Sequence, residues 1–400
     1  MKRTTLEEAS EFITDGTHGS PKRTEDANGI PLLSAKNVFD GEVRWEHFDR
    51  VPRSELDEFQ KRVHLKKGDV LMTCVGSIGR AAVWLNERPV VFFRSVAIIR
   101  PKLLLLPEYL EYIIRSAGFQ QELRRRTKQA SQGGIYLKDI KGIPIGVPPL
   151  AEQERIIKLL DEADELRKLR SQADRRTAAL IPALFHEMFG DVDRNSKHWP
   201  VVRFVDIGDA RLGKMLDAKQ QTGKHKRPYL RNANVQWDSL ALTDLLEMDF
   251  SEAEQLEFRL RYGDLLICEG GEVGRAAIWR DELPKCYFQK ALHRVRVHPS
   301  KATPEFLLHL LRACAAADGF RDLIGTATIP HLTGIKLASF RIPLPPLPLQ
   351  KVFAQRASEI REMEAGQALS GRRLKDLFHS MLHRAFEGSC DVLDGHTLNS

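Results

Sequence analysis

Basic and amide side chains occur at two matching places in the sequence, and both types can form paired hydrogen bonds with a planar partner. Lys36 and Asn37 follow one strand-like segment that contains a proline, and Arg231, Asn232 and Asn234 follow another. Arginine pairs well with guanine, and asparagine pairs well with adenine, in the major groove of DNA. These residues are therefore predicted to contact bases, and a role in holding the fold stays open for each of them.

Two glycine-rich turns, residues 75–80 and 270–275, provide further candidates, because glycine lets a backbone turn tightly and approach a ligand. These turns carry Ser77, Arg80, Glu272 and Arg275. Their arginines are expected either to bind phosphate or to pair with an acid of the fold, and a purely architectural turn is the open alternative. The remaining DNA-binding candidates lie in loops and in one basic run: Gly16, Thr17, His18, Arg124, Arg125, Gly133, Gly134, Lys214, Thr326 and Thr328.

The patterns that would indicate catalysis, nucleotide binding or a metal are incomplete. Residues 208–214 resemble a phosphate-binding loop, but Met215 stands where a Ser or Thr hydroxyl must hold magnesium. His379 and His383 are four residues apart on an expected helix, yet no third ligand is evident, which favours packing roles. No catalytic or metal-ligating residue is predicted.

Composition limits the class of protein. At about 100–200 residues per domain, a chain of 400 residues predicts two to four domains. Lys and Arg number 61 against 54 Asp and Glu, so the net charge of +7 modestly favours a polyanionic partner. Five cysteines without a Cys-x-x-Cys pair favour a reducing cytoplasm, and neither a signal peptide nor an apolar run of membrane-spanning length is apparent.

The chain repeats itself. Residues 68–84 and 263–279 share glycines, an Asp, an Arg and a Trp at identical spacing, with an offset of 263 − 68 = 195. A Pro-Pro-Leu-x-x-Gln turn at 148–153 recurs at 345–350, with an offset of 345 − 148 = 197. Such self-similarity predicts a tandem duplication of a unit of about 195 residues.

Each copy has two parts. The first is rich in glycine, proline and short strand-like runs, with a helix expected at 107–116, and predicts an α+β domain. The second is a long amphipathic helix with coiled-coil spacing, expected to kink near Pro182 in the first copy and to be weakened by Gly366 and Gly371 in the second. The expected boundaries are 1–147, 148–190, 198–344, 345–388 and a tail at 389–400.

The apolar seams that would pair the two helices are predicted from alternating steps of three and four residues. The seam positions are 156, 159, 163, 166, 170, 173, 177, 180 and 184 in the first helix, and 353, 356, 360, 363, 367, 370, 374, 377 and 381 in the second. Because a lone helix of this kind exposes its apolar stripe, the two helices are expected to pair antiparallel about a pseudo-twofold axis.

With these features together, the chain resembles the DNA-specificity subunit of a type I restriction–modification enzyme. The resemblance covers about residues 4 to 388 and rests on the duplicated order of motifs at 13–19, 68–84, 148–153, 184–186, 263–279, 345–350 and 377–379. It implies two target recognition domains, each recognising one half of a split sequence in double-stranded DNA. The second copy departs from the pattern at Pro348 and Leu349, where an acidic residue is usual before the Gln.

The resemblance also implies partners. The helices would form the spacer and the docking surface for two methyltransferase subunits, which bind S-adenosylmethionine and methylate adenine, while this chain binds no cofactor itself. Whether restriction subunits that hydrolyse ATP also join is left open. The docking residues implied are Gln153, Leu166, Leu184, Phe185, Gln350, Leu377 and Phe378.

Two other classes of function remain as alternatives. A stand-alone DNA-modifying enzyme would need a carboxylate cluster or the Asp/Asn-Pro-Pro-aromatic tetrapeptide of adenine methyltransferases, whereas the Pro-Pro pairs here follow Val147 and Leu344. A coiled-coil scaffold without a DNA role would tolerate charge reversal in the loops of both domains.

Overall fold

The computed structural model describes residues 2–127, 134–192, 194–217, 222–317, 319–320 and 331–386. The chain divides into two compact units, which we call unit 1 (1–171 with 369–400) and unit 2 (172–368). Both boundaries fall inside long helices, so each unit contains part of the long helix that follows the first copy and part of the one that follows the second.

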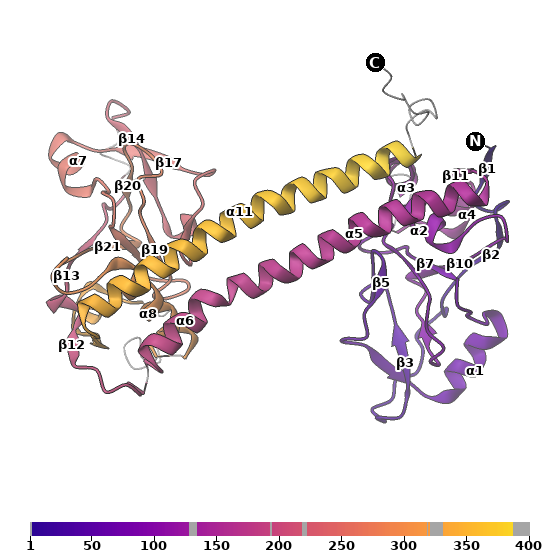
Figure 1. Cartoon of the computed structure of the whole chain (residues 1–400), viewed down its shortest axis with the longest axis horizontal. Helices are drawn as coiled ribbons and strands as arrows, with labels where there is room; N and C mark the ends of the chain where they lie inside the picture. Colours follow the sequence, from indigo (N-terminus) through magenta and orange to yellow (C-terminus); the bar gives the residue numbers. More distant parts are fainter. Residues whose placement is uncertain are drawn as a thin grey trace, which may run out of the picture. The chain divides into compact units, whose positions relative to one another are not determined.

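Unit 1 mixes short strands with helices, as the α+β prediction requires (Figure 1). Its strands are β1 (Lys2–Thr5), β2 (Ser10–Asp15), β3 (Ile30–Leu33), β4 (Val38–Phe39), β5 (Glu42–Val43), β6 (Asp49–Val51), β7 (Val70–Thr73), β8 (Ala81–Val83), β9 (Val91–Phe92), β10 (Val96–Pro101) and β11 (Pro144–Val147). Its helices are α1 (Arg53–Arg62), α2 (Pro107–Arg115), α3 (Ala117–Thr127), α4 (Leu137–Lys141) and most of α5 (Leu150–Ala178).

Unit 2 repeats this plan. Its strands are β12 (Val201–Arg203), β13 (Gly208–Leu212), β14 (Lys226–Leu230), β15 (Val235–Gln236), β16 (Ser239–Leu240), β17 (Leu246–Asp249), β18 (Leu265–Cys268), β19 (Ala276–Ile278), β20 (Tyr287–Phe288), β21 (Leu292–Val297) and β22 (Arg341–Pro343). Its helices are α6 (Leu180–Phe189), α7 (Glu252–Phe258), α8 (Pro304–Ala316), α10 (Gly334–Ser339) and the first half of α11 (Leu347–Phe386), with 3-10 turns η1 (Phe204–Asp206) and η3 (Asn232–Asn234).

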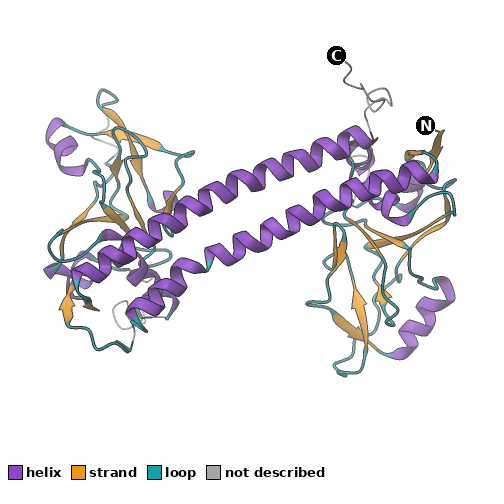
Figure 2. Ribbon diagram, in the orientation of Figure 1, coloured by secondary structure: helices purple, strands orange, loops and turns teal. Residues whose placement is uncertain are grey.

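The sheets of the two units correspond strand for strand. Figure 2 shows that both units combine strands with helices. The antiparallel order β2-β10-β7-β8 is matched by β13-β21-β18-β19, and the mixed order β6-β3-β9 by β17-β14-β20. The pairs β1-β11 and β4-β5 are matched by β12-β22 and β15-β16. The structure therefore has the duplication that the sequence predicts.

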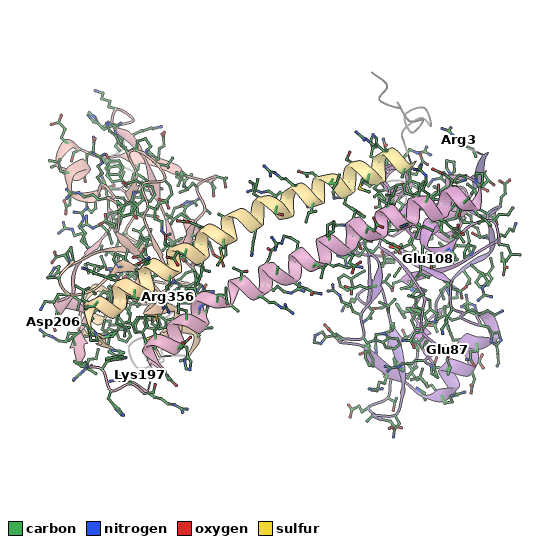
Figure 3. All side chains as sticks on the ribbon, in the orientation of Figure 1. Arg3, Glu87, Glu108, Lys197, Asp206 and Arg356 are labelled. Atoms are coloured by element: carbon green, nitrogen blue, oxygen red, sulfur yellow. The ribbon has the colours of Figure 1, made fainter. Side chains whose placement is uncertain are left out.

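The central sheet of unit 1 separates two apolar cores. Alternate residues of β7 point to opposite faces: Val70 and Met72 belong to the core that includes α2 and α5, and Leu71 to the core under β3 and α1. In Figure 1, β3 and α1 lie at the end of unit 1 away from the start of α5. Figure 3 labels one residue in each of these two parts of unit 1. Glu108 lies in the first turn of α2, and Glu87, in the loop after β8, lies nearer to the end with β3 and α1.

The repeated Gly-Asp…Trp motif is structural in both units. Gly68 and Gly263 have positive φ angles of 90° and 85°, a conformation that glycine adopts freely. The Asp69 carboxylate pairs with the Arg100 guanidinium at 2.7 Å, and the Asp264 carboxylate pairs with that of Arg296 at 2.9 Å. The Gly-Asp pair of the motif therefore closes the turn before the central strand in each unit.

Proline interrupts one long helix, whereas glycine leaves the other intact. Helix α5 ends at Ala178 and α6 begins at Leu180, before Pro182. This confirms the predicted interruption, because a proline ring clashes with the carbonyl four residues earlier, here that of Ala178. Helix α11 runs unbroken through Gly366 and Gly371, so the expected weakening does not interrupt it.

The helices pair antiparallel within each unit. In unit 1, Leu160 near the start of α5 shares a core with Phe378 and Leu382 near the end of α11. In unit 2, Phe185 of α6 lies 5.4 Å, between ring centroids, from Phe353 in the first turns of α11. The direction of pairing therefore agrees with the sequence-based expectation.

Each predicted seam is wrong at three positions, which are exposed: 159, 166 and 180 in the first helix, and 356, 363 and 377 in the second. In α5, Leu160 is buried and Leu159 is 43% exposed. In α11, Ala357 and Phe378 are buried, whereas Arg356 and Leu377 are exposed. The buried or half-buried positions are 156, 160 and 163 in α5, and 353, 357 and 360 in α11, so the first step is four residues and the second is three. The predicted seams step by three residues first. The difference arises because the cores of the two units select which apolar row faces inward.

Candidate nucleic-acid interface

The predicted residues of unit 1 gather where several strands end. Ser95 is the junction: its carbonyl accepts a hydrogen bond from the Cys74 amide at 2.8 Å, and its Oγ accepts one from the Ala35 amide at 3.0 Å. The Thr17 amide donates to the Phe92 carbonyl at 2.7 Å. Loops 16–19, 34–37, 74–80 and 93–95 thus form one surface, which we call the loop edge of unit 1.

Unit 2 has the same arrangement. The Glu269 amide donates to the Ala291 carbonyl at 3.0 Å, and the Lys290 amide donates to the Lys214 carbonyl at 2.9 Å. Asn232 Nδ2 donates to the Gly270 carbonyl at 2.7 Å. Loops 213–215, 231–234, 269–275 and 289–291 form the loop edge of unit 2. The fold therefore brings together residues that are up to 79 positions apart in unit 1 and 78 in unit 2, since 95 − 16 = 79 and 291 − 213 = 78.

Several candidates of unit 1 are available to a ligand. The exposed ones are His18, Lys36, Ser77, Arg124 and Arg125. His18 Nε2 lies 3.3 Å from Asp15 Oδ1, and Arg125 pairs with Glu122 at 2.8 Å. Arg80 is half-buried, with its guanidinium 4.8 Å from the centre of the Phe39 ring. Exposed donors of this kind are able to meet phosphates or base edges.

The candidates of unit 2 are more tightly held. Arg231 pairs with Asp244 at 2.5 Å, and Arg275 pairs with Glu272 at 3.2 Å. Arg275 Nη2 also donates to the Asn232 carbonyl at 3.1 Å. Glu272 itself is 52% exposed. Both arginines therefore have acidic partners in the fold, which is one of the two roles expected for Arg275.

Asn37 and Asn234 hold the fold. Asn37 is 2% exposed and its Nδ2 donates to the carbonyls of Arg44 and Glu46; Asn234 is 1% exposed and its Nδ2 donates to those of Ala241 and Asp244. Their burial favours the fold-holding role that the sequence left open over base contact, because a buried amide with its partners satisfied has no free face for a base edge.

Gly16 and Lys214 also have structural roles rather than the predicted DNA contacts. A Cβ on Gly16 would lie 2.1 Å from the Phe92 carbonyl oxygen, so this buried glycine allows two backbones to cross. Lys214 Nζ lies 2.5 Å from Glu254 Oε2 and 2.7 Å from the Asp249 carbonyl, with 11% of its side chain exposed. Thr17 has a buried hydroxyl next to Gly16.

Four further residues predicted to bind DNA lie outside the two loop edges. Gly133, Thr326 and Thr328 lie outside the described residues. Gly134 is half-buried and forms an isolated antiparallel bridge with Val75, beside the loop edge of unit 1.

Sequence reasoning missed two exposed cations. Arg94 and Lys290 lie at equivalent places in the turns before β10 and β21. Their offset of 290 − 94 = 196 lies between the two offsets of the duplication, and this match is the signal that would have found them.

The predicted docking residues separate into two groups. Gln153 and Gln350 are fully buried, and each bonds its own domain: Gln153 Nε2 donates to the Leu104 carbonyl at 2.7 Å, and Gln350 Oε1 accepts from the Thr303 amide at 3.0 Å. Phe185 and Phe378 are 3% and 2% exposed. Burial corrects the docking role for these four residues. Three leucines keep apolar surface: Leu166 and Leu377, each 51% exposed, and half-buried Leu184.

Among the described residues, no group of three or more His, Cys, Asp or Glu side chains is arranged to hold a metal ion. Within the same part of the chain, no helix combines the length and the apolar character that crossing a membrane requires.

Known proteins share this architecture. A chain from a structural study of the complex assembly and conformational transition of the type I R-M system aligns over 96% of this chain and 97% of its own length, with a TM-score of 0.61 and 18% identity. The type I restriction-modification S subunit of M. genitalium aligns over 96% of both chains, with a TM-score of 0.55 and 14% identity. At these identities the likeness concerns the fold alone.

Sequence comparisons point to the same group. The specificity subunit of type I restriction enzyme EcoKI from Escherichia coli K12 is 22% identical over 394 residues, 90% of this chain and 82% of that subunit. The putative MjaX specificity subunit of Methanocaldococcus jannaschii is 22% identical over 387 residues, covering 90% and 86%. The EcoBI specificity subunit of Escherichia coli is 29% identical over 167 residues, 40% of this chain and 35% of that subunit.

The profile of one family matches twice. Described as the type I restriction modification DNA specificity domain, it matches residues 21–174 and again residues 196–364. The matches fall on the two copies, and they do not support a stand-alone enzyme or a scaffold without a DNA role. The chain therefore belongs to the family of type I restriction–modification DNA specificity subunits.

Proposed function

We propose that each loop edge recognises one half of a bipartite target in double-stranded DNA. The supporting observation is that the same set of loops meets at the same strand ends in both units, with exposed cations in each. A positive surface binds the phosphates, while side chains in the grooves select the bases. Lys36, Ser77 and Arg94 are the candidates in unit 1, and Arg231 and Lys290 are those in unit 2.

The chain selects sites and leaves the chemistry to its partners. We assign methylation of adenine to two methyltransferase subunits that bind S-adenosylmethionine, because the family of this chain is one of DNA specificity domains and the sequence has no Asp/Asn-Pro-Pro-aromatic tetrapeptide. Such partners take the target base out of the stack before reacting with it.

The exposed apolar residues of the long helices are the proposed docking surface for these subunits. In unit 1 they are Leu150, Leu159, Leu166, Leu169, Leu369 and Leu377, and in unit 2 they are Leu180, Val352 and Met363. Their exposed fractions range from 38% to 52%, so each of them keeps apolar surface in contact with water. A methyltransferase subunit on this surface would remove them from water.

Mapping of methylated adenines tests the proposal. The chain is coexpressed with a methyltransferase subunit of the same system, and the methylated positions of the host genome are sequenced. We expect the proteins to copurify and the methylated sites to share a split motif with a constant gap. An unsplit motif, or a methyltransferase that selects the same sites without this chain, would contradict the proposal.

A further inference from the structure

A buried carboxylate joins a loop of unit 2 to helix α11. Asp238 occupies the turn between β15 and β16, with a φ angle of 56°. Its Oδ2 accepts a hydrogen bond from Arg361 Nε of α11 at 2.8 Å, and its Oδ1 accepts one from Arg280 Nη2 at 2.8 Å. Only 13% of its side chain is exposed. The same carboxylate therefore binds the helix and the end of the central sheet.

The turn continues into the loop edge of unit 2. The Asp238 amide donates to the Ala276 carbonyl at 3.1 Å, and the neighbouring Trp237 Nε1 donates to Glu272 Oε1 at 2.6 Å. Glu272 in turn pairs with Arg275, whose Nη2 bonds the Asn232 carbonyl. A continuous series of polar contacts thus runs from α11 to the glycine-rich loop.

Electrostatics make this connection strong. Burial on its own raises the pKa of Asp238, but the charges of Arg361 and Arg280 outweigh burial and hold the pKa below its usual value. His309 Nε2 lies 3.9 Å from Asp238 Oδ2, and burial lowers the pKa of His309 to about 4, so the imidazole is neutral near pH 7. Both arginines therefore face an ionised carboxylate in a region with little water to screen it.

Unit 1 lacks this connection. Gly41 takes the place of Asp238, since 238 − 41 = 197 and its amide makes the equivalent bond to the Ala81 carbonyl, at 2.9 Å. The helix residue equivalent to Arg361 is Asp164, since 361 − 164 = 197, and it pairs with Arg115 of α2 at 3.5 Å. Glycine offers no side chain to the helix, so the loop edge of unit 1 is not held in this way.

We propose that Asp238 is a positioning residue that fixes the loop edge of unit 2 on α11, and so determines where the second half of the target is recognised. The inference rests on the proposed function and adds to it the group that holds one of the two recognition surfaces. Asp238 need not touch DNA, because it acts through Trp237, Glu272 and Arg275.

Two substitutions with matched controls test the proposal in the complete complex with its methyltransferase. Asp238→Gly removes the carboxylate and keeps a residue that accepts the positive φ; Asp281→Gly is its control, at an exposed turn residue with a φ of 60°. Arg361→Met removes the helix partner; Arg356→Met is its control, at an exposed position of the same helix (Figure 3).

The probes are three duplexes: one with the full methylated motif, one with its first half scrambled and one with its second half scrambled. Perturbing such a coupling typically changes affinity by a few-fold to about thirtyfold. We expect Asp238→Gly and Arg361→Met to reduce discrimination at one half only, by about tenfold. Amide exchange in residues 269–276 of the free chain should accelerate in these variants and not in the controls.

The outcomes separate the two claims. Wild-type complex that discriminates neither half contradicts the proposed function and the positioning role with it. Wild-type discrimination at both halves, with variants that match their controls in binding and in exchange, overturns the positioning role alone. An equal loss at both halves in parallel with a lower melting temperature also overturns it, because that pattern indicates general destabilisation.

Discussion

The two units share a backbone plan but join their long helices through different polar contacts. In unit 1, the helix residue Asp164 pairs with Arg115 of α2, which also binds Glu111 at 2.8 Å. In unit 2, the equivalent helix residue is Arg361, and it binds Asp238 of a loop. The two copies have matching sheets, but the equivalent helix residue is negatively charged in unit 1 and positively charged in unit 2. The backbone plan is therefore set by features that both copies keep, whereas each helix junction depends on its own ion pairs.

Loss of the aromatic anchors should have the largest effect and should be similar in both units. Phe378→Ala in unit 1 and Phe185→Ala in unit 2 each remove a buried ring, at an expected cost of about 3–5 kcal/mol in the free energy of unfolding. Chemical denaturation of the full chain measures it. Leu377→Ala is the control, because it is exposed and should change stability by less than about 0.5 kcal/mol.

A stable Phe378→Ala variant would show that the helix end does not anchor unit 1 as the packing indicates. Leu377→Ala should have the opposite profile, with normal stability and weaker copurification with the methyltransferase. If both variants lost stability equally, the separation of the anchoring row from the docking row would be wrong.

The buried glutamines offer a second test of symmetry. Gln153 bonds the Leu106 amide and the carbonyls of Leu104 and Pro148, all within 2.9 Å, and Gln350 makes the equivalent bonds in unit 2. Replacing either residue with Ala leaves buried backbone groups unpaired, at about 1–3 kcal/mol. Thermal unfolding of both variants is the measurement, and a loss in only one of them would show that the two helix starts are held differently.

The charged junctions should respond to pH in opposite directions. Burial raises the pKa of Glu111 to about 7 from a reference of 4.5, so its favourable contribution to unit 1 is complete below about pH 4.5 and is lost as pH rises through about 7. Burial lowers the pKa of His309 to about 4 from 6.5, so its contribution to unit 2 is complete above about pH 6.5 and is lost as pH falls towards 4.

Two variants isolate these contributions. Between pH 5 and pH 8, Glu111→Gln should remove a component of the melting temperature that falls with rising pH, and His309→Phe should remove one that rises with rising pH. Melting curves of the full chain measure both changes. A shift of the same sign in the two variants would contradict the contrast between the junctions.

The smallest expected effects concern the exposed cations at the loop edges. Arg94→Ala and Lys290→Ala should each weaken DNA binding regardless of base sequence and reduce the salt slope by about one unit. Arg203→Ala is the control, since Arg203 lies at the end of β12 in unit 2 and pairs with Asp206 at 2.9 Å. Binding isotherms at several salt concentrations measure the slope, and an unchanged slope in one variant would restrict phosphate contact to the other unit.

The duplication, the α+β character of each copy, the long helices and the break near Pro182 all follow from the amino-acid sequence alone. They are properties of local spacing: glycine and proline set turns and helix ends, and apolar periodicity sets helices and strands. The residues that turned out to hold the fold, such as Asn37 and Gln153, share their side-chain chemistry with residues that bind ligands, so residue type alone did not distinguish the two roles.

Tertiary structure decided which apolar row of each helix is buried, and which candidate side chains remain exposed. Leu159 and Leu160 are identical in chemistry and adjacent in sequence, yet only Leu160 faces a core. Tertiary structure also decided the ion pairs of Asp238, because its partners Arg280 and Arg361 lie 42 and 123 residues away in the sequence. Burial and ion pairing depend on contacts between segments remote in sequence, and only the folded chain brings those segments together.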